Sequence, residues 1–423
     1  MLPLVGPRII PQLGGRRGGP AAAAITAGVS SSIATAPRAA PPALTALVER
    51  FDHTAFDLPG ARAVIRLEVE DGDEWDVIVE RGRVRLAEPG RGGPDALLSA
   101  DPKTWDAIAA DVARGMDAFR RGRLRVRRNL HLGVGFLAAT SGMTGPGKLR
   151  FRRVRTGTGA FSVIEAGAGP PVLMLHGLGG TKASFLPSIA ALAPSFRTIA
   201  VDLIGFGDSD KPLGASYGPE FQARAIEQLL DALELERAHF VGHSMGGRVA
   251  LEVGFRHATR TQGLVLMTPA MAWLRERRWA PYLRWVRPEL GLIQLAPRAA
   301  VEHFMRRLIP GADTSWGQSA IDEFVRTYTT ARGRAALYAA ARSIYLDEPH
   351  GEEGFWSRLR ALAPESLFIW GRQDRLIPTA FMKHVERALP AAQHVELDCG
   401  HLPQIERPRE THAAIARFLK TVR

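Results

Sequence analysis

A serine lies between two glycines in the stretch Gly242-His243-Ser244-Met245-Gly246, directly after the apolar run Ala238–Val241. A G-x-S-x-G spacing after a strand predicts a sharp turn from strand to helix. The turn needs glycines because bulkier neighbours would clash with the helix that follows. It lifts the hydroxyl of Ser244 above the sheet, where a base and a substrate carbonyl can both reach it. The motif therefore predicts a nucleophilic serine.

A serine hydroxyl is a weak nucleophile unless a base takes its proton, and the base needs an acid to orient it. His401 lies on a loop after the predicted strand His394–Leu397, the usual place of the base. Asp374 follows the buried apolar run Glu365–Gly371, at the carboxyl end of another predicted strand. Asp398 is the competing acid, but it lies only three residues before His401 in the same turn. We therefore predict Asp374 as the acid.

Acyl transfer also needs hydrogen-bond donors aimed at the oxyanion that forms on the attacked carbonyl. The apolar run Pro171–Leu175 ends in the H-G-L-G-G loop His176–Gly180, whose glycines leave backbone N–H groups free. We predict that the backbone N–H groups of Leu178 and of Met245, the residue after the nucleophile, form the oxyanion hole. This chemistry needs no metal and no cofactor.

These motifs resemble the α/β-hydrolase superfamily over residues 150–423. Two further matches are the D-x-x-G-x-G-x-S turn Asp202–Ser209 and the H-x-x-x-x-E-x-P pattern of His401, Glu406 and Pro408. The resemblance implies an α/β fold, with a mostly parallel sheet flanked by helices and a helical cap. A serine at the turn argues against dehalogenase or epoxide hydrolase chemistry, which in this superfamily uses an aspartate there.

About a hundred residues separate the predicted strand Gly263–Met267 from the strand that holds Ile369, far more than a simple crossover needs. We predict a helical cap over about residues 270–357. Its first predicted helix, Trp273–Val286, mixes Trp and Tyr with Arg, which suits contact with a membrane surface. The alternative is an ordinary cap helix with its aromatic side chains buried. Either way the entrance looks apolar, which favours a lipophilic substrate.

Residues 43–147 differ from the rest of the chain in their pattern of apolar and polar residues. The alternating stretches Ala63–Glu70, Trp75–Glu80 and Arg83–Leu86 predict an antiparallel meander with one apolar face. The pair Asp101-Pro102 predicts an N-cap followed by proline at the first helical position. The polar, glycine-rich stretch 140–147 has the composition of a linker, so we expect each half of the chain to fold by itself.

Residues 43–147 resemble the sterol carrier protein family, chiefly through Leu98–Trp105 and Gly115–Val126. The resemblance implies a smaller α+β domain with an apolar tunnel for a fatty acid or a sterol. The family usually carries a Gly-Asp pair after the last strand, and Arg128-Asn129 stands in its place here. A purely structural or oligomerising domain is the alternative.

The charge, the cysteine content and the N-terminal composition limit which partners and which cellular compartment are expected. The chain of 423 residues has 55 Lys and Arg against 43 Asp and Glu, but no nucleic-acid motif accompanies the excess, so no nucleic-acid binding is predicted. Cys399 is the single cysteine, which fits a reducing, cytoplasmic compartment. Residues 1–42 contain no acid and are expected to be disordered. Export through a twin-arginine signal at Arg16-Arg17 is the alternative location, opposed by Gly18-Gly19-Pro20 directly after it.

From the sequence we predict a serine hydrolase that cleaves a carboxylic ester of a small lipophilic substrate, joined to a lipid-binding module with 43–147 and 148–423 as its domains. A peripheral contact of the cap with a membrane is one interpretation of its first helix, and an ordinary cap helix is the other. One alternative is a carbon–carbon bond hydrolase of aromatic degradation, which shares the triad and a similar cap. Another is a lipid carrier whose hydrolase-like domain is not catalytic.

Overall fold

The computed structural model describes residues 39–111, 113–271, 278, 280–295, 297–308 and 313–422. The chain divides into a short unit, residues 1–39, and one compact unit, residues 40–423. The predicted disorder of residues 1–42 and the Arg16-Arg17 signal fall almost wholly outside the described residues. None of the helices in the described ranges is long and apolar enough to cross a membrane.

The first part of the compact unit is a five-stranded sheet in the order β3-β2-β1-β4-β5, and its described residues include the helices α1 to α4. The predicted meander is present, since β1 pairs antiparallel with β2 and β2 with β3, while β4 adds to β1 in parallel. Asp101 caps its helix as expected, because its side chain accepts a hydrogen bond from the Thr104 N–H. The elements are α1 (Pro42–Glu49), β1 (Arg62–Val69), β2 (Glu74–Glu80), β3 (Arg83–Ala87), β4 (Ala96–Ala100), α2 (Pro102–Ala110), α3 (Ala113–Arg120), β5 (Leu124–Arg127) and α4 (Leu130–Ala139).

The second sheet has eight strands in the order β13-β12-β11-β10-β8-β9-β7-β6, parallel from β13 to β9 and antiparallel at β7 and β6. Its strands are β6 (Arg150–Arg155), β7 (Ala160–Ala166), β8 (Pro171–Leu175), β9 (Arg197–Val201), β10 (Ala238–His243), β11 (Thr261–Met267), β12 (Glu365–Gly371) and β13 (Gln393–Leu397). The inner strands β8 and β12 are nearly continuous apolar runs because helices cover both faces, whereas the edge strand β13 alternates polar and apolar residues.

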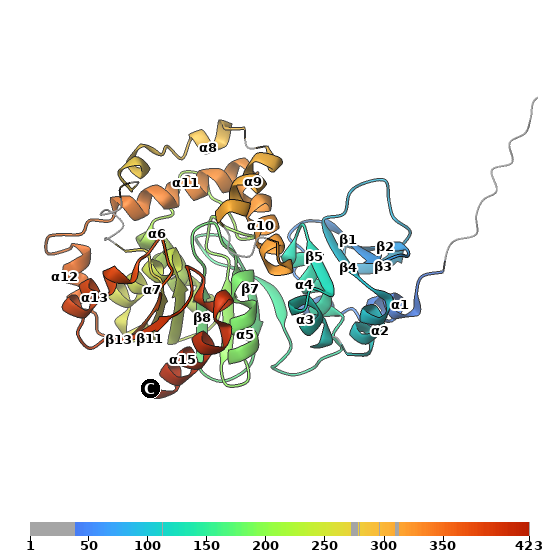
Figure 1. The fold of residues 1–423 in the computed structure, drawn as a ribbon, viewed down its shortest axis with the longest axis horizontal. Helices are drawn as coiled ribbons and strands as arrows, with labels where there is room; N and C mark the ends of the chain where they lie inside the picture. Colours follow the sequence, from blue (N-terminus) through green and yellow to red (C-terminus); the bar gives the residue numbers. More distant parts are fainter. Residues whose placement is uncertain are drawn as a thin grey trace, which may run out of the picture. The chain divides into compact units, whose positions relative to one another are not determined.

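Helices α6, α7 and α13 pack on one face of this sheet, and α5 and α15 pack on the other. Their bounds, with that of the short α14, are α5 (Leu186–Leu192), α6 (Pro219–Ala232), α7 (Met245–Arg256), α13 (Met382–Ala388), α14 (Pro403–Glu406) and α15 (Pro408–Thr421). This mostly parallel sheet between two helical layers is the predicted α/β fold (Figure 1).

The chain between β11 and β12 forms a helical insertion, the cap, of which Figure 1 shows α8, α9, α10 and α11 lying together. The described part of the expected first helix is the 3-10 helix η5 (Ala280–Trp285), not an α-helix. Trp273 and Trp279 lie outside the described residues. The remaining cap helices are α8 (Leu290–Ile293), α9 (Arg298–Leu308), α10 (Ser315–Tyr328), α11 (Ala331–Leu346) and α12 (Phe355–Arg360).

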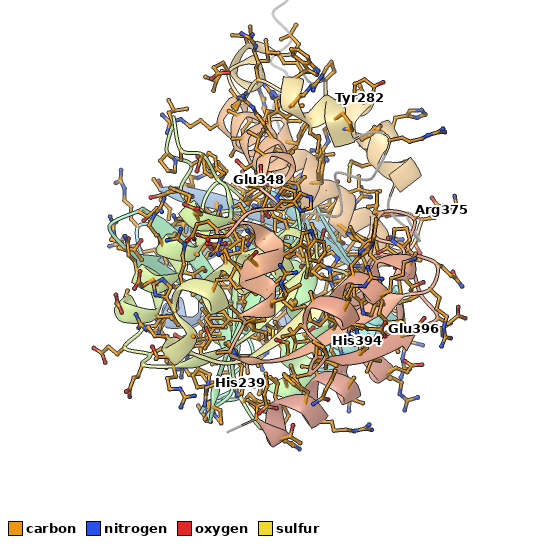
Figure 2. The ribbon with its side chains drawn as sticks, turned by 90° about the vertical axis from the view of Figure 1, so that its left-hand side faces the viewer. His239, Tyr282, Glu348, Arg375, His394 and Glu396 are labelled. Carbon is orange, nitrogen blue, oxygen red and sulfur yellow. The ribbon has the colours of Figure 1, made fainter. Side chains whose placement is uncertain are left out.

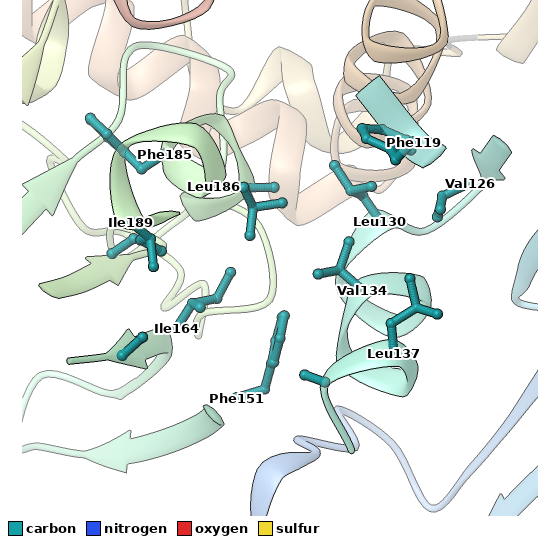
Figure 3. Close-up of a cluster of buried hydrophobic side chains, with 14 of the residues drawn as sticks. Phe119, Val126, Leu130, Val134, Leu137, Phe151, Ile164, Phe185, Leu186 and Ile189 are labelled. Carbon is teal, nitrogen blue, oxygen red and sulfur yellow. The ribbon is translucent and has the colours of Figure 1, made fainter. Parts of the chain in front are cut away.

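One hydrophobic cluster runs from the first sheet into the second (Figure 3). Val134 and Leu137 of α4 belong to it, together with Ile164 of β7 and Leu186 and Ile189 of α5. The two halves therefore bury apolar surface against each other, which counts against the expectation that each half folds by itself. The composition of residues 140–147 indicates a linker between the two halves. It does not predict how much apolar surface the halves bury against each other.

Candidate active site

Ser244 stands at the turn between β10 and α7, in a backbone conformation with φ 52° and ψ −114°. L-residues rarely adopt a positive φ, so the surrounding structure must hold the serine in place. A Cβ on Gly246 would lie 2.0 Å from the carbonyl oxygen of Leu175, and one on Gly242 would lie 2.4 Å from the carbonyl oxygen of Gly246. Both glycines of the motif are therefore required by close backbone contacts.

Three side chains that are far apart in the sequence meet at this turn. Nε2 of His401 lies 3.1 Å from Oγ of Ser244, and Nδ1 of His401 lies 2.7 Å from Oδ2 of Asp374. The other carboxylate oxygen of Asp374 accepts the backbone N–H groups of Leu376 and Ile377 at 2.7 and 2.9 Å. These bonds fix the carboxylate, which orients the imidazole with its Nε2 toward the serine.

The competing acid, Asp398, points elsewhere. Its carboxylate accepts a hydrogen bond from Nε2 of Gln373 at 2.9 Å and lies 3.7 Å from the guanidinium of Arg407. The structure therefore brings Asp374, and not Asp398, to His401. The catalytic roles of Ser244, Asp374 and His401 stay predictions, which the geometry supports.

The loop that carries His401 is held by groups on both sides. Glu406 accepts the N–H of Gly400 at 2.7 Å and the N–H of Leu402 at 3.0 Å, one on each side of the histidine. The His401 carbonyl accepts Nε2–H of His243 at 2.7 Å and the hydroxyl of Thr268 at 3.2 Å. Glu406 was part of a recognised pattern. The sequence analysis missed His243, although it lies inside the serine motif, and Thr268, for which the sequence carries no signal.

Two groups beside the triad have strongly shifted pKa values. Burial, together with the nearby imidazole of His401, lowers the pKa of His243 to about 3. His243 is therefore neutral near pH 7, which suits a ring that donates one hydrogen bond to a carbonyl. Burial and the neighbouring carboxylate of Glu406 raise the pKa of the Cys399 thiol to about 12. Cys399 is thus a buried thiol and a poor nucleophile.

The predicted oxyanion loop lies against the turn. A Cβ on Gly177 would lie 3.2 Å from Cβ of Ser244, so Leu178 follows a residue in direct contact with the nucleophile. His176 fixes the loop, because its Nε2 accepts the Leu203 N–H at 3.0 Å while Nδ1–H donates to the Gly177 carbonyl at 2.8 Å. Met245 is the first residue of α7, where backbone N–H groups have no partner within the helix.

Helix α10 of the cap covers this loop. Gly179 has φ +73°, and a Cβ there would lie 2.5 Å from a ring carbon of Phe324, so only glycine fits under that ring. The ring of Phe324 stacks on Tyr328, one turn further along the helix, with 5.2 Å between ring centroids. One face of α10 thus packs at Gly179, the residue after Leu178 in the predicted oxyanion loop.

Another side of α10 is bound to the first domain by buried acids. Asp322 accepts Nε of Arg127 at 2.7 Å and the backbone N–H of Arg128 at 2.8 Å. Glu323 accepts the backbone N–H of Leu130, the first residue of α4, at 2.6 Å. We call Asp322 and Glu323 the clamp. An acid at a helix N-terminus satisfies an N–H group that would otherwise lack a partner and interacts favourably with the helix dipole.

Buried charges link the clamp to the turn after β9. Arg326 of α10 binds Glu323 at 2.9 Å and Asp208 at 2.6 Å, and Lys182 binds Asp202 at 2.6 Å and Asp208 at 3.3 Å. Burial alone would raise the pKa of Asp208, but Arg326, His131 and Lys182 hold it well below its ordinary value. Asp208 therefore joins the turn to the cap through Arg326, while Asp202 holds Lys182 beside it.

The fold and the site together define an α/β-hydrolase, and the chain belongs to that family. Residues 170–408 match the alpha/beta hydrolase fold family, which is more than half of the chain. Residues 45–137 match the SCP-2 sterol transfer family. The resemblances seen in the sequence are therefore confirmed for both parts of the chain.

The hydrolase part has relatives of known name. It is 31% identical over 261 residues to a 2-hydroxymuconate semialdehyde hydrolase of Pseudomonas sp. strain CF600, covering 60% of this chain and 88% of the relative. It is 28% identical over 276 residues to a 2-hydroxy-6-oxo-2,4-heptadienoate hydrolase of Pseudomonas putida, covering 63% and 95%. A solved hydrolase from Pseudomonas aeruginosa superimposes with a TM-score of 0.53 at 24% identity, covering 65% and 99%, which shows the shared fold.

Proposed function

We propose that the chain hydrolyses a carbon–carbon bond next to a carbonyl group, in a small conjugated acid of the 2-hydroxy-6-oxo-dienoate type. The observation that carries this proposal is the 31% identity, over 88% of its length, to a hydrolase named for 2-hydroxymuconate semialdehyde. The assembled Ser244, His401 and Asp374 support it. Carboxylic-ester hydrolysis, the main prediction from the sequence, becomes the second candidate.

The chemistry of such a substrate matches the site. It contains no ester, but its keto tautomer holds a carbonyl whose bond to the neighbouring carbon can break, because the electron pair left behind is delocalised over an enone or a keto acid. In the proposed mechanism His401 takes the proton of Ser244 as Oγ adds to the carbonyl carbon. The N–H groups of Leu178 and Met245 bind the oxyanion, and Asp374 stabilises the imidazolium.

The intermediate then collapses. The carbon–carbon bond breaks, the departing carbon takes the proton from His401, and the acyl group stays on Ser244. Water, activated by His401, releases it as a carboxylic acid. The sum is the addition of one water across the carbon–carbon bond, with no oxidation or reduction.

Ester hydrolysis remains a candidate because the same steps cleave an ester and because the hydrolase part is fused to an SCP-2 domain. We propose that this domain binds a fatty acid or a sterol. A groove of about 980 Å³ lies between the two parts, lined in the main by apolar groups that include Phe119, Leu186, Trp316 and Pro408. Its lining fits an acyl chain, and Trp316 would report binding through its fluorescence.

One substrate panel tests these candidates. The purified chain is assayed on 2-hydroxymuconate semialdehyde and on p-nitrophenyl butyrate and decanoate. We expect kcat/KM on the dienoate to exceed that on either ester at least 100-fold, with both activities lost in Ser244→Ala. A reversed ratio would establish ester hydrolysis instead. No turnover of any of them, with retained binding of a fluorescent fatty acid, would favour a lipid carrier.

A further inference from the structure

The outer part of the cap exposes a run of large apolar side chains. Ile293 and Leu295 are 77% and 89% exposed, and Tyr282 and Trp285 are 73% and 69% exposed. Figure 2 shows Tyr282 in the cap, far from His239 at the other end of the sheet. We call these residues the cap ridge, made of Tyr282, Trp285, Leu290, Leu292, Ile293 and Leu295. Single exposed apolar residues are ordinary, but six within fourteen positions mark an interaction surface.

The ridge is held in place from below. Gly291 is buried, and a Cβ there would lie 2.6 Å from the backbone nitrogen of Ala335 in α11. The buried guanidinium of Arg334 donates to the Gly291 carbonyl at 3.0 Å. The side chain of Gln294 is hydrogen-bonded to the hydroxyl of Tyr338, also in α11. Because this backbone is fixed on α11 at Gly291, its apolar neighbours Leu290, Leu292 and Ile293 remain in the solvent.

The charged residues around the ridge indicate which kind of partner it binds. Within the described residues 278 and 280–295, the exposed charged side chains are Arg278, Arg284 and Arg287 against Glu289. The guanidinium of Arg284 lies over the ring of Trp285, 4.9 Å from its centroid. Apolar and aromatic side chains interleaved with arginines suit the boundary between acyl chains and anionic headgroups. A second copy of this surface would bring arginines against arginines.

We propose that the cap ridge docks on an anionic lipid bilayer, with its apolar side chains entering the headgroup region and its arginines binding lipid phosphates. The membrane contact that the sequence left as one of two interpretations is thereby assigned to a defined surface. The proposal does not rest on the reaction proposed above, since docking is measured without turnover.

Sedimentation of the full chain with lipid vesicles tests it. Vesicles of phosphatidylcholine and phosphatidylglycerol in equal amounts are compared with phosphatidylcholine alone. We expect at least tenfold tighter binding to the anionic vesicles, weakened by salt. The double variant Ile293→Asp with Leu295→Asp should bind at least tenfold more weakly, and Ile293→Ser with Leu295→Ser should also lose affinity.

The matched control is Leu213→Asp with Met143→Asp, which places the same charges at two exposed apolar residues outside the cap, 58% and 45% exposed. It should bind within twofold of the parent. Equal loss in the ridge and control variants would overturn the proposal, because a change in net charge would then suffice. So would equal binding to both kinds of vesicle, or a parent dimer that the ridge variant turns into a monomer without any vesicle binding.

Discussion

The two sides of the cap meet their surroundings in opposite ways. At α10, the clamp acids Asp322 and Glu323 are 1% and 5% exposed and bind donors of the first domain. At η5 and α8, the ridge leaves Ile293 and Leu295 in the solvent. A buried carboxylate is stable only when its oxygens accept hydrogen bonds or pair with a cation. An exposed apolar side chain is instead stabilised when a partner covers it. The first side therefore fixes the cap, and the second is free to meet a partner.

The comparison matters for function only if the cap covers a working triad, and this test has the largest expected effect. Ser244→Ala should lower kcat about 10⁴- to 10⁶-fold, and His401→Ala nearly as much, because the triad acts as a unit. Thermal unfolding should show intact folds in both. Unchanged turnover in either variant would contradict the assignment of the site.

The choice of acid gives the next largest effect. Asp374→Asn should cost about 10³- to 10⁴-fold in kcat, because the amide no longer holds the imidazole in the tautomer that accepts the serine proton. Asp398→Asn is the matched control, and it should leave kcat within about twofold, since Asp398 binds Gln373 instead. A harmless Asp374→Asn would reverse the assignment.

The contrast between clamp and ridge is tested directly by the free energy of unfolding. Asp322→Ala should lower it by about 1–3 kcal/mol, because the backbone N–H of Arg128 and the guanidinium of Arg127, both partly buried, lose their acceptor. Asp313→Ala, at an exposed acid of the same cap, and Ile293→Ser in the ridge should each stay within about 0.5 kcal/mol. Equal losses in all three, measured in urea, would remove the distinction.

As the pH falls, the buried histidines should be protonated before the carboxylates that hold the clamp in place. Burial lowers the pKa of His239 and of His412 to about 4, and that of His243 to about 3. Below pH 6.5 the unfolded chain binds protons that the folded chain does not. The free energy of unfolding should therefore fall between pH 6.5 and 4, by about 1.4 kcal/mol per pH unit for each histidine near the middle of that range.

The acids near the clamp should hold over that range, because the pKa of Asp208 lies well below its ordinary value in the fold. Their contribution is lost only at lower pH. His412→Gln keeps an acceptor for the Ser188 hydroxyl. It should reduce the slope of the free energy of unfolding against pH by the contribution of one histidine. A slope unchanged by this variant, or a free energy of unfolding that rises on acidification, would contradict the neutral state of these rings.

Much of the site could be predicted because its parts occur as local motifs. Ser244 with its glycines, the loop before Leu178 and the order of Asp374 and His401 are readable from short stretches that follow apolar strands. His243 and Thr268 could not be assigned, because their role depends on where a carbonyl more than 130 residues away comes to lie. Only the folded chain shows that both side chains bind the His401 carbonyl.

The clamp was equally hidden. Asp322 and Glu323 are ordinary polar residues of a helix in the sequence, and their partners lie more than 190 residues earlier. The packing of the two halves on each other was not predicted for the same reason, since the composition of the linker does not report long-range contacts. The prediction of ester hydrolysis depended on an apolar entrance to the active site. Such an entrance admits an ester and a ketone or aldehyde alike, so it does not distinguish between them.

The hydrophobic cluster shared by α4, β7 and α5 has a consequence for how the chain can be divided. A chain cut between residues 147 and 148 would expose Val134 on one fragment and Ile164 and Leu186 on the other. Each fragment would then carry the apolar half of an interface for the other. Produced together, the two polypeptides should assemble into a heterodimer that restores the clamp, and either one produced alone should aggregate.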